Sequence, residues 1–123
     1  MFVPLGIGSH VDHQIAFEAG RRLAGAGVPV FAYEDCPYAI HTPAGLPRRL
    51  EQVRGAVGEP VVAPIGDEVR ERRIAAIACY ASHMPVIFRS TSDFAGAVAA
   101  FAREVGGELG PAERFWPVLP CDG

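Results

Sequence analysis

Two histidines flank an aspartate near the start of the chain, in the sequence His10-Val11-Asp12-His13. At the start of a helix, this spacing places both imidazoles on one face, close enough to address one metal ion or one substrate. By spacing alone, such a pair can also cap a helix, pack or stay solvated. A divalent metal ion takes three or four protein ligands, and no other residues of this chain stand at an equally suggestive spacing.

The residues around this motif predict a strand, a tight turn and a helix. Phe2–Leu5 is a short apolar run, residues 6–9 form a glycine-punctuated turn, and helical periodicity extends over residues 10–24. Open α/β sheets bind ligands just beyond the carboxyl ends of their strands, which is where the histidines fall. We expect Ser9 to cap the helix and a core-facing stripe made of Ile15, Ala16, Ala19 and Leu23.

Polar residues also follow the next predicted strand. Residues 28–33 are apolar throughout, which is typical of a central parallel strand, and Glu34 and Asp35 come directly after Tyr33. Tyr33, Glu34 and Asp35 are therefore candidate substrate-binding residues. Alternatively, Tyr33 packs and the two acids hydrogen-bond the loop; the sequence favours neither interpretation.

The rest of the chain reads as further α/β structure. The expected elements are a long loop over residues 34–47, a short helix over 47–57, an edge strand over 61–65, a buried amphipathic helix over 67–81 and a last helix capped by Ser92. Residues 85–88 are open between a strand and a packed segment. His41, His83 and Arg89 are more simply explained as solvated or structural side chains.

Composition bounds the class of protein. The chain has 123 residues, half of them hydrophobic, which predicts one domain with its own core. Its net charge of -3 gives no basic footprint for nucleic acid, and no apolar run is long enough for a membrane span. Three widely spaced cysteines favour a reducing cytoplasm over a disulfide framework.

Three segments, in order, resemble one known family. Residues 4–13, which end in the His-Val-Asp-His motif, look like the second motif of the PIG-L/LmbE-type zinc deacetylases. Residues 33–39 and 74–82 are similar to later segments of that family, although His83 stands where glutamine is usual. The resemblance implies a Rossmann-like α/β fold with a partly parallel sheet, and hydrolysis of an acetamide on an N-acetylglucosamine-type glycoconjugate.

The resemblance also implies roles for the motif. His13 would bind zinc, His10 would face the substrate and stabilise or protonate the tetrahedral intermediate, and Asp12 would support the imidazole of His10. The family's Ala-His-Pro-Asp-Asp motif, which supplies the other ligands and the base, is absent. We therefore expect residues 1–123 to be a single partial domain, the C-terminal half of a deacetylase domain.

Two functions follow from these expectations. The first is a zinc-dependent N-deacetylase that acts on an N-acetylated sugar or glycoconjugate once the missing N-terminal half is supplied. The second is a non-catalytic remnant or binding module that keeps the fold and has lost the metal. Exposed apolar surface where the first half would pack predicts either partner binding or self-association.

Overall fold

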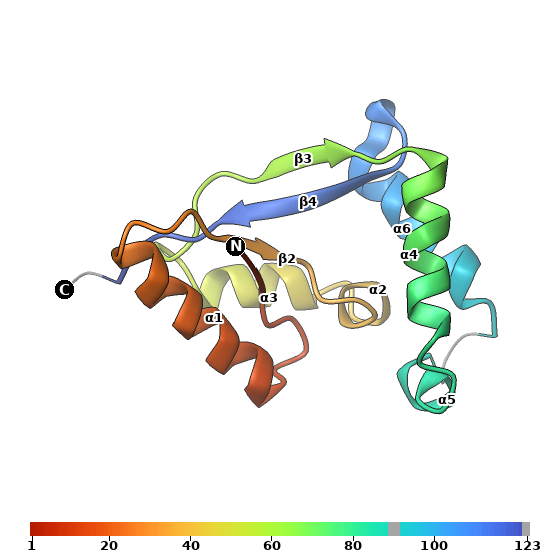
Figure 1. Ribbon diagram of the computed structural model, residues 1–123, viewed down its shortest axis with the longest axis horizontal. Coiled ribbons are helices and arrows are strands. Elements are labelled where there is room, and N and C mark those ends of the chain that lie inside the picture. The colour runs from red at the N-terminus through yellow and green to blue at the C-terminus, as the bar shows by residue number, and fades with distance from the viewer. Residues whose placement is uncertain (89–91, 122–123) are drawn as a thin grey trace. The chain divides into compact units, whose positions relative to one another are not determined.

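The computed structural model describes residues 1–88 and 92–121. The chain separates into a first unit, Met1–Val61 with Arg114–Gly123, and a second unit, Val62–Glu113, which are described one at a time. Figure 1 shows the elements in chain order, which are β1 (Phe2–Pro4), α1 (Val11–Gly25), β2 (Phe31–Tyr33), α2 (Tyr38–His41), α3 (Gly45–Gln52), β3 (Val61–Pro64), α4 (Asp67–Ala78), α5 (Met84–Ile87), α6 (Phe94–Gly106), a 3-10 turn (Gly107–Leu109) and β4 (Ala112–Pro117).

The strands form a sheet in the order β1-β2-β4-β3. β1 runs parallel to β2, with Val3 opposite Ala32, and β2 runs antiparallel to β4, with Ala32 opposite Trp116. The predicted α/β class with a partly parallel sheet is confirmed, as is an edge strand near residues 61–65. The strand at Ala112–Pro117 is not predicted from the sequence.

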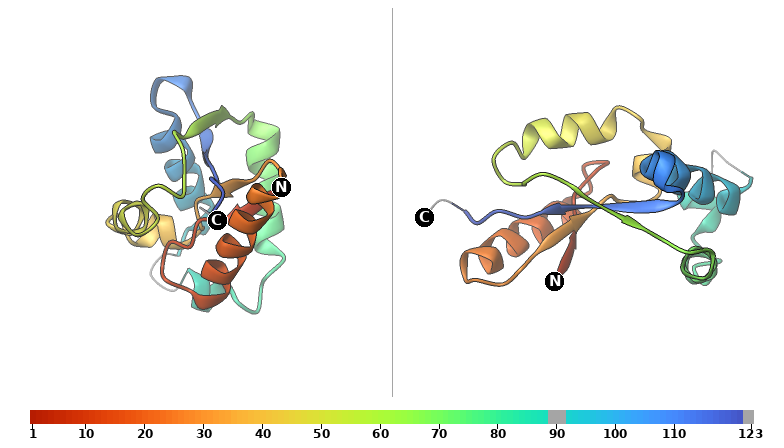
Figure 2. Two further views of the ribbon diagram at one scale, coloured as in Figure 1. Left: turned by 90° about the vertical axis from the view of Figure 1, so that its left-hand side faces the viewer. Right: turned by 90° about the horizontal axis from the view of Figure 1, so that it is seen from above.

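The core of the first unit lies between the sheet and its helices. α1 and α3 lie on the same side of the β1–β2 strands (Figure 2). The side chains of Leu5, Ile7, Phe17 and Ala32 are completely buried. Burial of both Leu5 and Ile7 continues the core past the end of β1, and this fixes the turn that leads to the histidines.

α1 faces the sheet with a different side from the predicted one. Phe17 and Gly20 are its buried residues, whereas Ile15 is 63% exposed and Leu23 is also exposed. Gly20 allows the close approach, because a Cβ there would lie 3.1 Å from Val3 Cγ1. The predicted core stripe is therefore wrong. α1 carries two apolar faces, and packing selects the one that contains the small residue.

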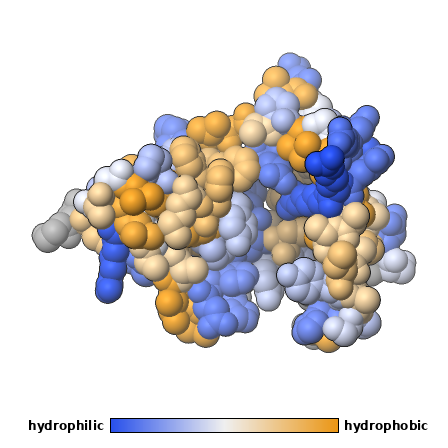
Figure 3. Space-filling model, in the orientation of Figure 1, coloured by the Kyte–Doolittle hydropathy of each residue, from blue (hydrophilic) through white to orange (hydrophobic). Residues whose placement is uncertain are grey.

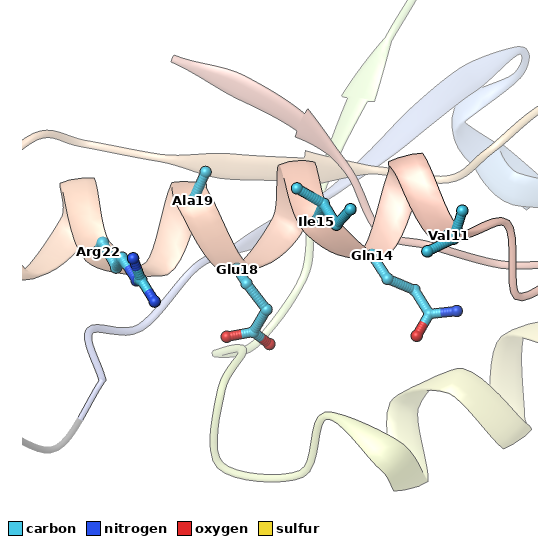
Figure 4. A pocket seen from close by; sticks show the side chains of 6 residues that line it. All are labelled: Val11, Gln14, Ile15, Glu18, Ala19 and Arg22. Atoms are coloured by element: carbon cyan, nitrogen blue, oxygen red, sulfur yellow. The ribbon is translucent and has the colours of Figure 1, made fainter.

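The outer face of α1 is exposed in consequence. Its side chains line an open groove of about 460 Å³, formed by Val11, Gln14, Ile15, Glu18, Ala19 and Arg22 (Figure 4). The space-filling view also shows hydrophobic residues on the surface over α1 (Figure 3). This surface belongs to the first unit alone.

Both predicted helix caps shift by one residue. An N-cap residue has extended backbone angles, and His10 has them (φ -64°, ψ 127°), whereas Ser9 has a positive φ of 62°. His10 therefore caps α1. At α6 the cap is Asp93, whose carboxylate accepts a bond from the Gly96 amide at 2.9 Å, and not Ser92.

The predicted loop over residues 34–47 contains helices. α2 occupies its middle, and α3 begins at Gly45, earlier than the predicted residue 47. Pro47 does not delay that start because the first-turn amides of a helix have no internal partner to lose. Residues 85–88, left open by the sequence, fall mostly in the short helix α5.

The second unit holds α4, α5 and α6. α4 has no buried residue, and Ile74 and Ile77 are only half-buried, so the prediction of a buried helix over residues 67–81 is wrong. Arg73 pairs with Glu113 at 2.5 Å within this unit. The apolar residues of α4 are spaced as in a buried helix, but most residues of the helix, including its acids and Arg72, are exposed. No helix of the described residues is long and apolar enough to cross a membrane.

Candidate functional site at the end of β1 and β2

A turn of unusual backbone conformation connects β1 to α1. Gly6 and Gly8 have φ angles of 92° and 89°, in the region that glycine adopts at least cost. Gly8 also lies against the ring of Tyr38, where a Cβ would come within 2.6 Å of Cδ1. The turn brings the chain round so that His10 caps α1 and His13 lies in the first turn of the helix.

His13 is held by a buried carboxylate from the neighbouring strand. Its Nδ1 lies 2.6 Å from Asp35 Oδ1, and the Asp35 side chain is only 1% exposed. Neither atom has another hydrogen-bond partner among the described residues. The other oxygen, Oδ2, accepts bonds from the Gly6 and Ile7 amides at 2.7 and 2.8 Å. Asp35 thus fixes the turn and the imidazole together.

Parallel pairing explains why these residues meet. β1 and β2 run in the same direction, so the turn after β1 and the residues after β2 emerge at the same edge of the sheet. The amide of Leu5 donates to the Tyr33 carbonyl at 2.9 Å, which continues the pairing to the end of both strands. Asp35, two residues further, then lies under the turn.

The arrangement determines which nitrogen of His13 is available. With Nδ1 facing a buried carboxylate, the proton is expected on Nδ1 and the lone pair on Nε2. The His13 side chain is 33% exposed, and its ring lies edge-on to Tyr38 with centroids 6.0 Å apart. An imidazole held in this way by a carboxylate is a common support for a metal-binding nitrogen.

His10 lies beside His13, with ring centroids 5.0 Å apart. Its Nδ1 accepts a bond from the backbone amide of Asp12 at 3.3 Å, whereas the Asp12 carboxylate is 3.9 Å away and exposed. The histidine pair is thus brought together as the spacing predicts. The closest contact of His10 with Asp12 is to its backbone rather than to its carboxylate.

The other two candidate residues have different surroundings. Glu34 is buried and accepts bonds from the Arg114 guanidinium and from Trp116 Nε1, the latter at 3.0 Å, so it ties β2 to β4. Tyr33 is exposed, and its pKa is raised by partial burial and then by the charge of Asp35. Of these two, Tyr33 has the more accessible polar group.

Several solved structures share this fold. The structure of the antimicrobial reagent A40926 pseudoaglycone deacetylase matches with a TM-score of 0.77 at 23% identity, over 99% of this chain and 50% of that chain. The zinc inhibited form of teicoplanin deacetylase matches with a TM-score of 0.75 at 25% identity, over 98% of this chain and 45% of that chain. A deacetylase-teicoplanin complex matches with a TM-score of 0.70 at 25% identity, over 99% and 44%.

The chain has a deacetylase-like fold. It spans about half the length of the solved deacetylases that it matches. No protein-family model matches the sequence, and no curated protein does.

The site of this deacetylase-like fold offers an incomplete ligand set for a metal. In the described parts of the chain, no group of three or more histidine, cysteine, aspartate or glutamate residues is placed to hold one metal ion. His13 has the environment of a ligand, because its remaining nitrogen is oriented by Asp35. The described residues therefore fit one ligand of a zinc site, which takes three or four protein ligands.

A second, polar depression of about 200 Å³ adjoins the turn, lined by Gly6, Gly8, Ser9, Thr42, Gly45, Arg48, Arg49 and Gln52. Burial lowers the pKa of Arg49, and its Nε donates to the Leu5 carbonyl at 2.8 Å. The guanidinium also lies over the Phe17 ring at 5.2 Å. Arg49, which belongs to α3, therefore contacts both the end of β1 and Phe17 of α1.

The sequence predicts Asp35 as a candidate substrate-binding residue, but it does not predict the contact of Asp35 with His13. The signal that could indicate this contact is the place of Asp35 just after the strand that runs parallel to β1. His41 and His83 are exposed, and Ser82 Oγ lies 3.0 Å from His83 Nδ1. Arg89 lies outside the described residues.

Proposed function

We propose that this chain supplies one half of a zinc-dependent N-deacetylase of the PIG-L/LmbE type. The observation that carries the proposal is the Asp35–His13 pair beside His10, at the carboxyl end of two parallel strands, in a chain that has the fold of half of a deacetylase. A carboxylate that orients one imidazole beside a second imidazole is suited to metal-assisted hydrolysis.

Each residue has a role in this proposal. His13 binds zinc through Nε2, and Asp35 holds its Nδ1–H. His10, whose ring adjoins that of His13, faces the substrate carbonyl and donates a hydrogen bond or a proton to the developing oxyanion. Asp12 steadies His10. When bound, zinc would polarise the acetyl carbonyl and lower the pKa of a water molecule to about 7.

The substrate class is an N-acetylated amino sugar carried on a larger molecule. Two kinds of support converge on it: the motif resembles that of deacetylases of N-acetylglucosamine conjugates, and the matching structures are named as deacetylases of teicoplanin and of A40926 pseudoaglycone. Tyr33, exposed at the end of β2, is the candidate for contact with sugar hydroxyls. A cytoplasmic location remains a prediction from the cysteine pattern.

The histidine roles are separable by mutation. In a complex of this chain with a complementary deacetylase half, His13→Ala is expected to remove zinc almost completely. His10→Ala should keep the zinc and slow acetate release by about 100-fold or more, because it removes an acid-base group. Zinc content by elemental analysis and acetate release from an N-acetylglucosamine conjugate measure the two effects. The reverse pattern would exchange the two roles.

A non-catalytic binding module is the second candidate. It is favoured by one observation: no group of three metal-binding side chains is found among the described residues. On that function, mixing with the complementary half yields neither stoichiometric zinc nor acetate. Finding both would exclude the binding module.

A further inference from the structure

The polar depression beside the histidine turn is rich in hydrogen-bond donors. It has a volume of about 200 Å³ and lies wholly within the first unit. The side chains that line it supply two hydroxyls, one amide and two guanidinium groups, from Ser9, Thr42, Gln52, Arg48 and Arg49. Two of these side chains are cations, and none of the described residues that line the depression is an acid. The lining therefore favours an anionic occupant that accepts hydrogen bonds.

Arg49 is a buried and well-positioned cation. It is 8% exposed, its Nε donates to the carbonyl that follows β1 at 2.8 Å, and its Nη1 donates to Gln52 Oε1 at 3.3 Å. Its Nη2 lies against the turn, where a Cβ on Gly6 would come within 3.1 Å of it. Burial lowers the pKa of Arg49, whereas the charges of Glu18 and Asp35 act to raise it, and arginine keeps its proton inside proteins. A guanidinium held in this way is suited to bind a carboxylate or phosphate group.

Arg48 brings a second positive charge to the same depression. Its side chain is exposed. Exposed arginines elsewhere, such as Arg54 and Arg72, pair with a carboxylate three or four residues away. Within residues 1–88 and 92–121, the ion pairs of the other arginines have no counterpart at Arg48. The charge of Arg48 is therefore available to a ligand.

The depression and the histidine pair share one turn. Ser9 lines the depression and directly precedes His10, so the Cα atoms of these two residues are about 3.8 Å apart. Gly8, which also lines the depression, lies against the Tyr38 ring, and that ring contacts His13 edge-on. A group bound in the depression would therefore lie close to the position proposed for the acetamide.

We propose that this depression binds an oxyanion, a phosphate or carboxylate group, that is carried by the acetylated substrate. Arg48 and Arg49 balance its charge, and the hydroxyls of Ser9 and Thr42 donate hydrogen bonds to its oxygens. The assignment to the substrate rests on the proposed function, because it takes the acetamide to lie at His10. Binding of the anion itself requires neither zinc nor turnover.

Titration of the full chain with inorganic phosphate, without metal, tests the site. Amide NMR signals of residues 6–9 should shift and saturate, and Arg48→Gln should weaken the affinity by about tenfold or more. Arg49 is left intact because it also supports the end of β1. Arg22→Gln is the matched control, since it removes the same charge from an exposed side chain in the last turn of α1. It should change the affinity by less than about twofold.

Two results would overturn the oxyanion site. One is the absence of saturable shifts in residues 6–9. The other is equal weakening by Arg48→Gln and Arg22→Gln, because phosphate would then respond only to the overall charge of the chain.

N-acetylglucosamine 6-phosphate tests whether the anion belongs to the substrate. It should bind about tenfold more tightly than inorganic phosphate and should also shift the signals of His10. Equal affinity for the two phosphates, with no change at His10, would overturn the assignment to the substrate. If phosphate binds but the complex with a complementary half holds no zinc, the oxyanion site stands and the proposed hydrolase function fails. Zinc retention and acetate release without phosphate binding would have the opposite meaning.

Discussion

Replacing Asp35 by alanine is expected to lower the free energy of unfolding by about 3 to 5 kcal/mol. The carboxylate accepts bonds from the amides of Gly6 and Ile7, and without it both amides lose their partner inside the protein. Each buried unsatisfied group costs about 1 to 3 kcal/mol, and His13 Nδ1 loses its partner as well. Urea unfolding followed by circular dichroism measures the change.

Asp35→Asn is the matched control. Its amide oxygen can still accept from Gly6 and Ile7, so most of the stability should return, at a cost of about 1 to 2 kcal/mol for the weaker neutral bonds. Its NH₂ group would face His13 and favour the wrong tautomer. Stability would then recover without restored metal binding. If alanine is tolerated as well as asparagine, Asp35 does not hold the turn.

Gly8→Ala is expected to lower the free energy of unfolding by about 3 kcal/mol. The φ of 89° accounts for about 1 to 2 kcal/mol of strain in any residue with a Cβ, and contact with the Tyr38 ring at 2.6 Å adds overpacking of similar size. Displacement of Tyr38 would also reach His13, whose ring it contacts edge-on. Thermal unfolding and the aromatic NMR signals of Tyr38 follow the two effects.

Gly27→Ala is the control that measures backbone strain without a steric clash. Gly27 has a similar φ of 85°, but nothing lies within 4 Å of its added Cβ. Its substitution should therefore cost about 1 kcal/mol, from backbone strain alone. Equal costs at the two positions would mean that Tyr38 moves aside freely and that the turn is not clamped.

The position of the site is predictable from the sequence, and its internal contacts are less so. The spacing of His10 and His13 on one helix face predicts their proximity, and the rings lie 5.0 Å apart. Asp35 is predictable as a strand-end residue. Whether its side chain turns out toward substrate or in toward the turn depends on the positive-φ backbone at Gly6 and Gly8, which residue types alone do not specify.

In the fold as well, the sequence pattern predicts some features and side-chain packing decides others. The parallel pairing of β1 and β2 follows from apolar runs on either side of a helix. The face of α1 that packs on the sheet does not follow from the sequence in this way. Ile15 and Phe17 both belong to plausible apolar stripes, and only the close contact at Gly20 decides between them. β4 is not predicted from the sequence for another reason. Arg114 is paired with Glu34, so a charged residue lies where a buried strand is expected to be apolar.

In the proposed function, Asp35 fixes His13 so that Nε2 is the nitrogen that receives the metal. Long-range proton–nitrogen NMR on the full chain, with the ring nitrogens of histidine labelled, reads this directly, because protonated and unprotonated imidazole nitrogens have well-separated shifts. We expect a proton on Nδ1 of His13 and none on Nε2 when the imidazole is neutral, and loss of that preference in Asp35→Asn. A proton on Nε2 in the unmodified chain would contradict it.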